Sequence, residues 1–327
     1  MKDTRQSPFK PPARGNTRGR PAPTQSPQKA ERIRLRPEMA VGEAFLVSVE
    51  ASLLHLSANK APTLDGHPEG IHQSRVAMRR QRAALRAFKS ALPDAGRKAF
   101  NDEFRWFQKK LGPARDWHVF LDETTPQMVR DGVDESLVEK LRRLAHTERS
   151  RASRDAAECL KSRRFSRLLL EYQDWVEGLP ELDPVGKLKK KLAPFARSVL
   201  EKTHRDLLGD TRTLAQMSVE DLHALRIRGK NARYTGELFH AVFSPEQAAP
   251  QLALLSRFQD RLGETNDARV AQLILETLKP RQLSAQTIRA VNEWSGKRIL
   301  ACARRAQPEW RRLRGLEPFW RTPVNDR

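Results

Sequence analysis

The chain has 327 residues, and its 61 Lys and Arg against 40 Asp and Glu give a formal net charge of +21. Hydrophobic residues make up 38% of the sequence, enough to bury a core, which excludes a wholly disordered chain. No apolar run approaches the roughly 18 residues that cross a bilayer, so we expect no membrane span. The charge predicts a polyanionic partner: nucleic acid, an anionic membrane surface or another phosphate-rich polymer.

The cysteine content and the first residues bear on the cellular compartment. Two cysteines, Cys159 and Cys302, are too few for a disulfide scaffold or a zinc site built on cysteine pairs, and they fit a reducing compartment. The first 15 residues contain no apolar signal-peptide core. We therefore expect a cytoplasmic protein.

The segment 1–37 differs in composition from the residues that follow it. Residues 1–36 hold ten Lys or Arg, six prolines and few apolar side chains. Such a segment cannot bury enough surface to offset the entropy lost on ordering. We predict a disordered, basic, proline-rich tail, which either binds anions loosely or serves only as a solubilising spacer.

From residue 38 onward, apolar residues recur at helical spacing. Prolines and glycines separate these stretches, and no run of alternating β-branched residues indicates a sheet. The sequence therefore predicts an all-α protein of about ten helices. In chain order they cover residues 41–58, 71–92, 99–112, 135–160, 166–179, 187–208, 220–243, 249–263, 267–278 and 284–306.

The chain repeats itself at an offset of 151 residues. Residues 72–88 align with 223–239, and residues 107–119 align with 258–270, without a gap between the two blocks. The repeat predicts two related helical bundles, 38–180 and 181–322, that meet near the prolines at 180–184.

The first block of each repeat carries its cations on one face of a helix. At 100° per residue, one strip about 80° wide holds all five basic residues of the first copy. Apolar residues flank this strip on both sides, whereas a solvated face normally lies opposite the apolar stripe. We therefore expect a basic wall that faces a groove. The wall residues are His72, Arg75, Arg79, Arg82 and Arg86, then His223, Arg226, Lys230 and Arg233.

Like charges three and four residues apart repel by about 0.2–0.5 kcal/mol per pair. Two explanations are open: a bound anion relieves the repulsion, or carboxylates of other helices form salt bridges with the strip. Asp116 and Asp267, one in each copy, are expected to complement a helix N-terminus or to orient a groove arginine. Two further sets either line the groove or are ordinary surface charge: Lys190, Arg197 and His204 at heptad spacing, and Arg298 with Arg305.

The motifs HxxRVxxRRxR at 72–82, HxxRIxxKxxRY at 223–234 and LGxxRD/LGxxND after each resemble the CHAD family, the conserved histidine α-helical domain. The ending PEWRRLRGLEPFW at 308–320 is also similar, and the resemblance covers about 38–322. It implies two four-helix bundles related by pseudo-two-fold symmetry, with inorganic polyphosphate bound in a basic groove between them. Some members locate to polyphosphate granules. By position, the ligand contacts implied are the nine wall residues.

This chain departs from the family pattern at Gly229, Asn231 and Glu237, and these departures predict a weaker or narrower second half-site. The two wall histidines either donate to a phosphate or bond a backbone carbonyl. No P-loop, zinc motif or carboxylate cluster is present, so we expect a non-catalytic protein without metal or cofactor. Glu237 is the one candidate general base. The alternatives are a nucleic-acid binder and, less favoured, an enzyme that processes polyphosphate.

Overall fold

The computed structural model describes residues 26–278 and 283–321, and these form helices joined by short connections. Within the described residues there is no strand, only an isolated bridge between Ala40 and Lys191. The predicted all-α class is confirmed. Residues 1–25 hold most of the predicted tail and lie outside the described residues.

The first half of the chain runs from α1 to α8. Its helices are α1 (Val41–Ala58), α2 (Lys60–Leu64), α3 (Pro68–Ala87), α4 (Asp94–Lys110), α5 (Gly112–Val119), the π-helix η1 (Phe120–Thr124), α6 (Thr125–Arg130), α7 (Glu135–Lys161) and α8 (Arg163–Glu177). The second half begins with the short η2 (Lys187–Lys189) and α9 (Leu192–Leu208). It continues with η3 (Leu214–Gln216), α10 (Val219–Phe239), η4 (His240–Val242), α11 (Pro245–Thr277) and α12 (Ala285–Gly315).

Local sequence explains where the main helices start. Pro68 occupies the first turn of α3, where its missing N–H leaves no bond unmade, and the His67 side chain accepts from the Glu69 N–H. Ser218 and Asp221 form a reciprocal capping box at the start of α10. Ser244 caps α11 by accepting from the Gln247 N–H of the first turn.

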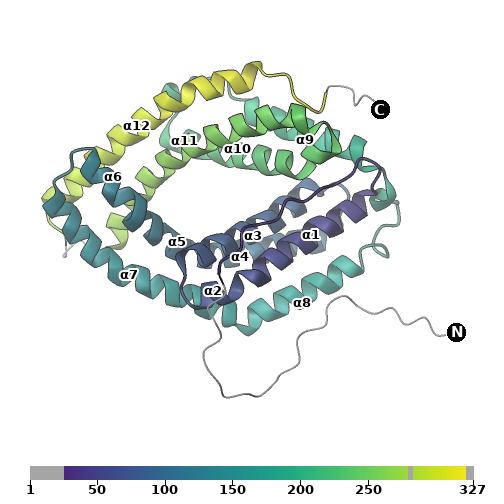
Figure 1. Cartoon of the computed structure of the whole chain (residues 1–327), viewed down its shortest axis with the longest axis horizontal. Coiled ribbons are helices and arrows are strands. Elements are labelled where there is room, and N and C mark those ends of the chain that lie inside the picture. The colour runs from purple at the N-terminus through teal and green to yellow at the C-terminus, as the bar shows by residue number, and fades with distance from the viewer. Residues whose placement is uncertain (1–25, 279–282, 322–327) are drawn as a thin grey trace.

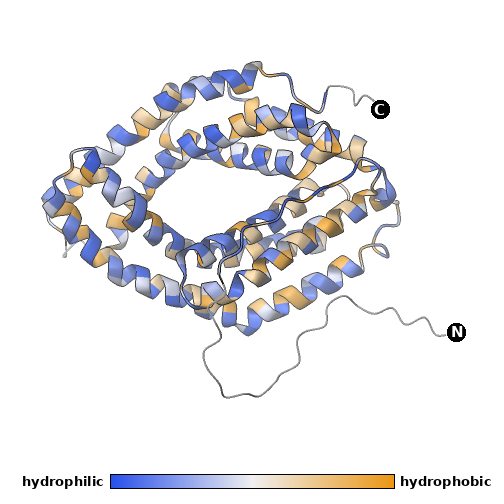
Figure 2. Cartoon of the chain, viewed as in Figure 1, coloured by the Kyte–Doolittle hydropathy of each residue, from blue (hydrophilic) through white to orange (hydrophobic). Residues whose placement is uncertain are grey.

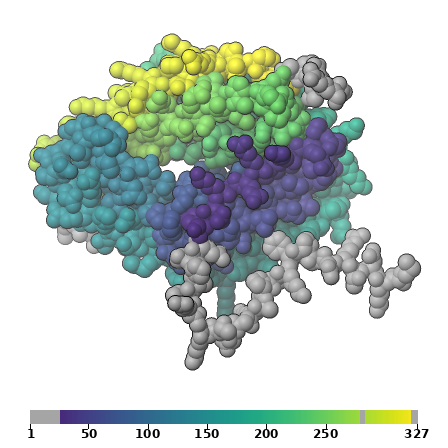
Figure 3. Space-filling view, viewed as in Figure 1, coloured from purple at the N-terminus to yellow at the C-terminus, as the bar shows by residue number. Residues whose placement is uncertain are grey.

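The two halves lie on either side of a central opening (Figure 1). In the first half α3 packs between α1 and α4, and in the second half α10 packs between α9 and α11. The space-filling view is hollowed between the first-half and second-half atoms (Figure 3). Hydrophilic residues are frequent on the helices around the opening (Figure 2). The aligned blocks thus fall on corresponding helices, while the pseudo-symmetry of the halves and the boundary near 180 stay predictions.

An aromatic cluster joins the halves at the C-terminal ends of α3 and α10. The rings of Phe88 and Phe239, which occupy equivalent positions in the repeat, lie 5.6 Å apart, and Phe195 of α9 stacks on Phe88 at 5.5 Å. Both repeat residues are fully buried. Such aromatic pairs contribute about 0.5–1.5 kcal/mol each beyond area burial. The cluster therefore fixes the distance between the two helices that carry the cationic strips.

Residues 26–37 differ from the prediction of a disordered tail. Leu35 is buried in the core, and the Gln28 backbone N–H donates to Asn59 Oδ1 at 3.0 Å. The Gln28 carbonyl accepts from Asn59 Nδ2, and Arg80 of α3 donates to the Glu31 carbonyl at 3.1 Å. We name residues 26–37 the N-terminal strap. The buried Leu35 side chain and these backbone hydrogen bonds order the strap. The average composition of residues 1–37 does not reveal them.

One described helix, α1, has the length and apolar character of a membrane span by composition, which corrects the expectation that no segment does. Part of its apolar surface nevertheless belongs to the protein core, because Phe45, Val49 and Leu56 are buried among neighbouring helices, whereas Leu46 and Leu54 are exposed. The buried apolar residues of α1 thus pack against other helices of the protein.

Candidate anion-binding channel

Two cationic strips face each other across the opening, one from α3 and one from α10. Arg79 Nη1 donates to the Tyr234 hydroxyl at 2.8 Å, which joins the first half of the chain to the second. Phe88 and Phe239 hold the ends of the same two helices together. We call the space between the strips the channel. Its cations are Arg75, Arg79, Arg82 and Arg86 of α3 and Arg226, Lys230 and Arg233 of α10.

The lowered pKa of Lys230, the one lysine of the channel, reflects the positive charge around it. Burial lowers the pKa of Lys230 to about 6, and the nearby charges of four arginines lower it as well. These four come from both strips: Arg226, Arg79, Arg75 and Arg233. Charges of both strips therefore act on the same amine, while the assignment of these residues as ligand contacts stays a prediction.

Among the described residues, close ion pairs with carboxylates are nearly absent from the strips. Within the described part of the chain, Arg233 is the one strip cation with an acidic oxygen within 4.0 Å, that of Glu237 at 3.6 Å. The remaining six, four of them on α3 and two on α10, have none. Salt bridges to other helices thus do not explain the strips, and the unrelieved repulsion favours a bound anion.

Two arginines of α3 are held by neutral acceptors on α4. Arg75 Nη1 donates to the Gln108 carbonyl at 3.1 Å, and Arg82 Nη1 donates to Gln108 Oε1 at 2.6 Å. Arg82 Nε also reaches Asn101 Oδ1 at 3.3 Å. Burial lowers the pKa of Arg75 and of Arg82 to about 10, so both stay cationic at neutral pH. These bonds orient the guanidinium groups without cancelling their charge.

The two repeat aspartates lie beside the strips. Burial raises the pKa of Asp116, although the charges of Arg75 and Arg115 oppose that shift. Burial likewise raises the pKa of Asp267, with Arg226 as the main opposing charge. Each aspartate thus stands near the equivalent arginine of its own copy, and neither comes within salt-bridge distance of it in the described structure. No hydrogen bond joins either aspartate to its arginine in the described structure, so the expected role of orienting a groove arginine stays a prediction.

Tyr234 is a channel residue that the sequence analysis did not assign. Its hydroxyl accepts from Arg79 at 2.8 Å and from Arg233 at 3.2 Å, and both guanidinium groups lie over its ring. Burial by itself raises the pKa of Tyr234, but these two arginines bring it below its ordinary value. The sequence feature that could have indicated this residue is the tyrosine at the end of the second motif, where the first copy has Ala83.

The two wall histidines are half-buried near the channel. Burial lowers the pKa of His72, and the charge of Arg115 lowers it further. Burial and then Arg269 lower the pKa of His223, whose Nδ1 is buried without a partner in the described structure. Arg115 and Arg269 were also not assigned from sequence, although Arg115 is the arginine of the LGxxRD motif.

The structure contradicts the assignment of Arg298 and Arg305 to the basic wall. Both donate to Glu264 Oε2, at 2.8 and 2.6 Å, and Arg298 also lies 3.3 Å from Asp131 Oδ2. They line a separate cavity of about 540 Å³ between η1, α6, α11 and α12. Carboxylates from distant parts of the sequence neutralise them, and sequence spacing does not reveal such partners.

Lys190 and Arg197 remain predictions. Both are exposed, and the Arg197 guanidinium lies 5.9 Å from the centre of the Phe243 ring. The backbone carbonyl of Lys190 accepts from the Val41 N–H at the start of α1. In the described structure, no contact joins either side chain to the strips.

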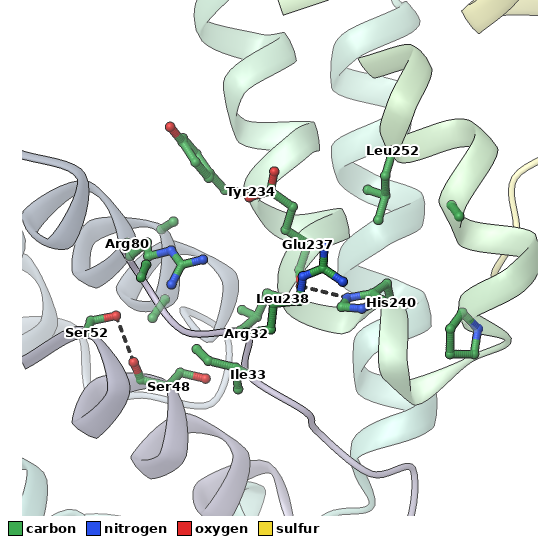
Figure 4. Close-up of a pocket in the computed structure, with 15 residues that line it drawn as sticks. Arg32, Ile33, Ser48, Ser52, Arg80, Tyr234, Glu237, Leu238, His240 and Leu252 are labelled. Carbon is green, nitrogen blue, oxygen red and sulfur yellow. Dashed lines mark hydrogen bonds between the residues drawn. The ribbon is translucent and has the colours of Figure 1, made fainter. Parts of the chain in front are cut away.

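A second cavity, of about 520 Å³, lies beneath the N-terminal strap and beside the channel (Figure 4). Arg32 of the strap, Arg80 of α3 and Glu237 of α10 project toward it from three sides (Figure 4). Tyr234 lines this cavity as well, and thus separates it from the strips.

Glu237, the candidate general base, is paired with Arg233. Within the described residues, no cluster of His, Cys, Asp or Glu could hold a metal ion.

Comparisons with known proteins agree with this architecture. A family model described as "CHAD domain" matches residues 48–276. A solved CHAD domain from the plant Ricinus communis is 29% identical, with 90% of this chain and 98% of that chain covered and a TM-score of 0.75. PptA from Streptomyces chartreusis is 18% identical over 83% of this chain and 99% of that one, with a TM-score of 0.61, which shows the fold alone. No curated protein matches the chain.

Proposed function

The chain belongs to the CHAD family, and on that premise we propose that it binds inorganic polyphosphate in the channel without catalysing a reaction. The observation that carries the proposal is the unneutralised charge of the two strips. Six of their seven cations have no acidic oxygen within 4.0 Å in the described structure. A linear polyanion that passes between the strips supplies the missing negative charge.

The chemistry of the strips suits a chain of phosphates. Polyphosphate carries about one negative charge per phosphate and offers no bases to stack or to read. Arginine forms planar, bidentate, charge-assisted bonds to phosphate and stays ionised at any cellular pH. Binding neutralises several phosphates and releases counterions, so the affinity should fall steeply with salt, as for other polyanions.

A nucleic-acid partner is the alternative. Proteins that bind single strands stack bases on aromatic side chains. Among the residues assigned to the channel, Tyr234 is the one aromatic, and two arginines already cover its ring. A competition assay separates the hypotheses: long-chain polyphosphate should displace a labelled single strand at far lower phosphate equivalents than unlabelled nucleic acid does.

An enzyme that processes polyphosphate is the third hypothesis, and an incubation tests it. Purified protein with long-chain polyphosphate and Mg²⁺ or Mn²⁺ should release no orthophosphate and leave the chain length unchanged. We further propose a cytoplasmic location at polyphosphate granules. A fluorescent fusion should co-localise with stained granules and become diffuse when the channel charge is reversed.

The decisive test reverses one cation on each strip. Arg75→Glu with Arg226→Glu should abolish retention on immobilised polyphosphate while circular dichroism stays helical. Arg143→Glu with Arg304→Glu is the charge-matched control, because both of these arginines are exposed on α7 and α12. Removal of residues 1–25 should cost little. Retention by the channel variant, or its loss on removing residues 1–25 alone, would refute the channel as the binding site.

A further inference from the structure

We propose that the two strips are unequal and that the phosphate held most tightly lies on the α10 side, against Arg226 and Lys230. This inference rests on the proposed function and reverses the expectation that the second half-site is the weaker one. It follows from a difference at one pair of equivalent positions: Pro113 in the first copy and Glu264 in the second.

Pro113 interrupts the helix next to the first strip. α4 ends at Lys110 and α5 begins at Gly112, so Gln108 belongs to a last turn whose carbonyls lack partners within the helix. The Gln108 carbonyl instead accepts from Arg75 Nη1. A Cβ at Gly112 would lie 3.1 Å from the same nitrogen, so the glycine leaves room for the guanidinium. The helix break thus binds Arg75 to the protein itself.

The second copy has no such break. α11 runs without interruption from Pro245 to Thr277, so its carbonyls near the middle are used within the helix. Gly263, equivalent to Gly112, has no side chain within 4 Å of where a Cβ would lie. Arg226, equivalent to Arg75, has its Nε buried without a hydrogen-bond partner in the described structure. Its guanidinium therefore makes no hydrogen bond to α11 in the described structure, although Asp267 of that helix is the opposite charge that acts on it most strongly.

The Gln259 side-chain amide, beside the second strip, also lacks hydrogen-bond partners in the described structure. Gln259 is equivalent to Gln108, which accepts from Arg82 in the first copy. Gln259 is 6% exposed, and within the described residues neither its Oε1 nor its Nε2 has a partner. The amide lies over Gly229, in the space that a larger residue would fill. Unsatisfied buried polar groups are costly, so their concentration at the α10–α11 interface marks the place where a ligand gains most.

The charges around Lys230 support the same side. Arg226 lies on the same helix, Arg79 reaches over from α3, and Asp116 of α5 is a weaker opposing charge. A phosphate group placed here would accept from the free guanidinium of Arg226 and would favour the protonated amine of Lys230. On the α3 side, Gln108 already occupies one donor of Arg75 and one of Arg82, which orients both guanidinium groups and leaves fewer of their N–H groups for a ligand.

A matched pair of single variants tests the inequality. Arg226→Gln and Arg75→Gln each remove one charge from equivalent positions, and Kd for long-chain polyphosphate is measured at one fixed salt concentration. Loss of charged hydrogen bonds at Arg226 should weaken binding by about 10- to 100-fold. Arg75→Gln should weaken it by about 2- to 5-fold, since only a longer-range charge is lost. Arg82→Gln serves as a second α3 variant, and thermal melting checks that each protein is folded.

The outcomes separate the two proposals. The inequality is overturned if the natural sequence binds tightly and the folded variants lose equal affinity, or if the α3 variants lose more. Either result leaves the proposed function standing. Failure of the natural sequence to bind polyphosphate removes the proposed function itself. Orthophosphate is the second probe: its binding should be weaker than that of the chain and should fall with Arg226→Gln but not with Arg75→Gln.

Discussion

Lys230 should make polyphosphate binding depend on pH. The pKa of Lys230 is about 6, because the amine is buried and because the charges of Arg226, Arg79, Arg75 and Arg233 act on it. At pH 7.5 the amine is therefore mostly neutral. A bound phosphate chain raises its pKa again, so binding takes up a proton, and the affinity should rise as the pH falls.

The size of the effect follows from proton linkage. Where the free protein is deprotonated at this site and the complex is protonated, one proton enters per bound ligand, and Kd falls about tenfold for each pH unit. As the pH is lowered, the affinity should rise down to about pH 6 and level off below the pKa of the free protein. His72 and His223, whose pKa values are lowered by burial, titrate below the main part of this window.

The assay is a Kd measurement with long-chain polyphosphate from pH 6 to pH 8 at constant ionic strength. Lys230→Arg is the matched variant, since a guanidinium keeps its charge throughout the window. We expect a slope near one proton for the natural sequence and a nearly flat profile for the variant. A flat profile for the natural sequence, or an unchanged slope in Lys230→Arg, would refute the assignment of the proton to this amine.

The lowered pKa of Lys230 has the opposite effect on the pH dependence of folding stability. Without ligand, the folded-state pKa lies below the unfolded value of 10.5, so the unfolded chain binds more protons between about pH 6 and 10.5. This group therefore adds stability as the pH rises through that window and removes it as the pH falls. Chemical denaturation of ligand-free Lys230→Met should show a smaller gain in stability with pH than the natural sequence shows.

Two further substitutions test the packing and the second strip. Gly70→Ala should lower the stability by about 1–3 kcal/mol, because its Cβ would lie 2.6 Å from Pro62 Cβ. Gly263→Ala, which meets nothing within 4 Å, is the control in the same thermal melt, and equal melting temperatures would contradict the packing argument. Glu237→Gln should tighten polyphosphate binding about 2- to 5-fold in the Kd assay, because it releases Arg233 from an ion pair at 3.6 Å. Weaker binding would show that the carboxylate supports the site.

The sequence alone determined the helical class and the position of the cationic strips along their helices. Both depend on local geometry, since a helix turns 100° per residue wherever it forms. The offset of 151 residues also indicated that two strips belong together, and Phe88 and Phe239 do meet between the halves. Periodicity and repetition are properties of neighbouring residues, so they can be read before the chain is folded.

Tertiary structure alone decided which charges stay unpaired. Glu264 neutralises Arg298 and Arg305 from 34 and 41 residues away, a pairing that no local pattern encodes. The strap is ordered because Leu35 and the backbone at Gln28 find partners on helices that follow it in sequence. The inequality of the strips likewise depends on where a helix break places one carbonyl relative to Arg75. Each is a contact between distant segments, and its energy exists only once the helices have packed together.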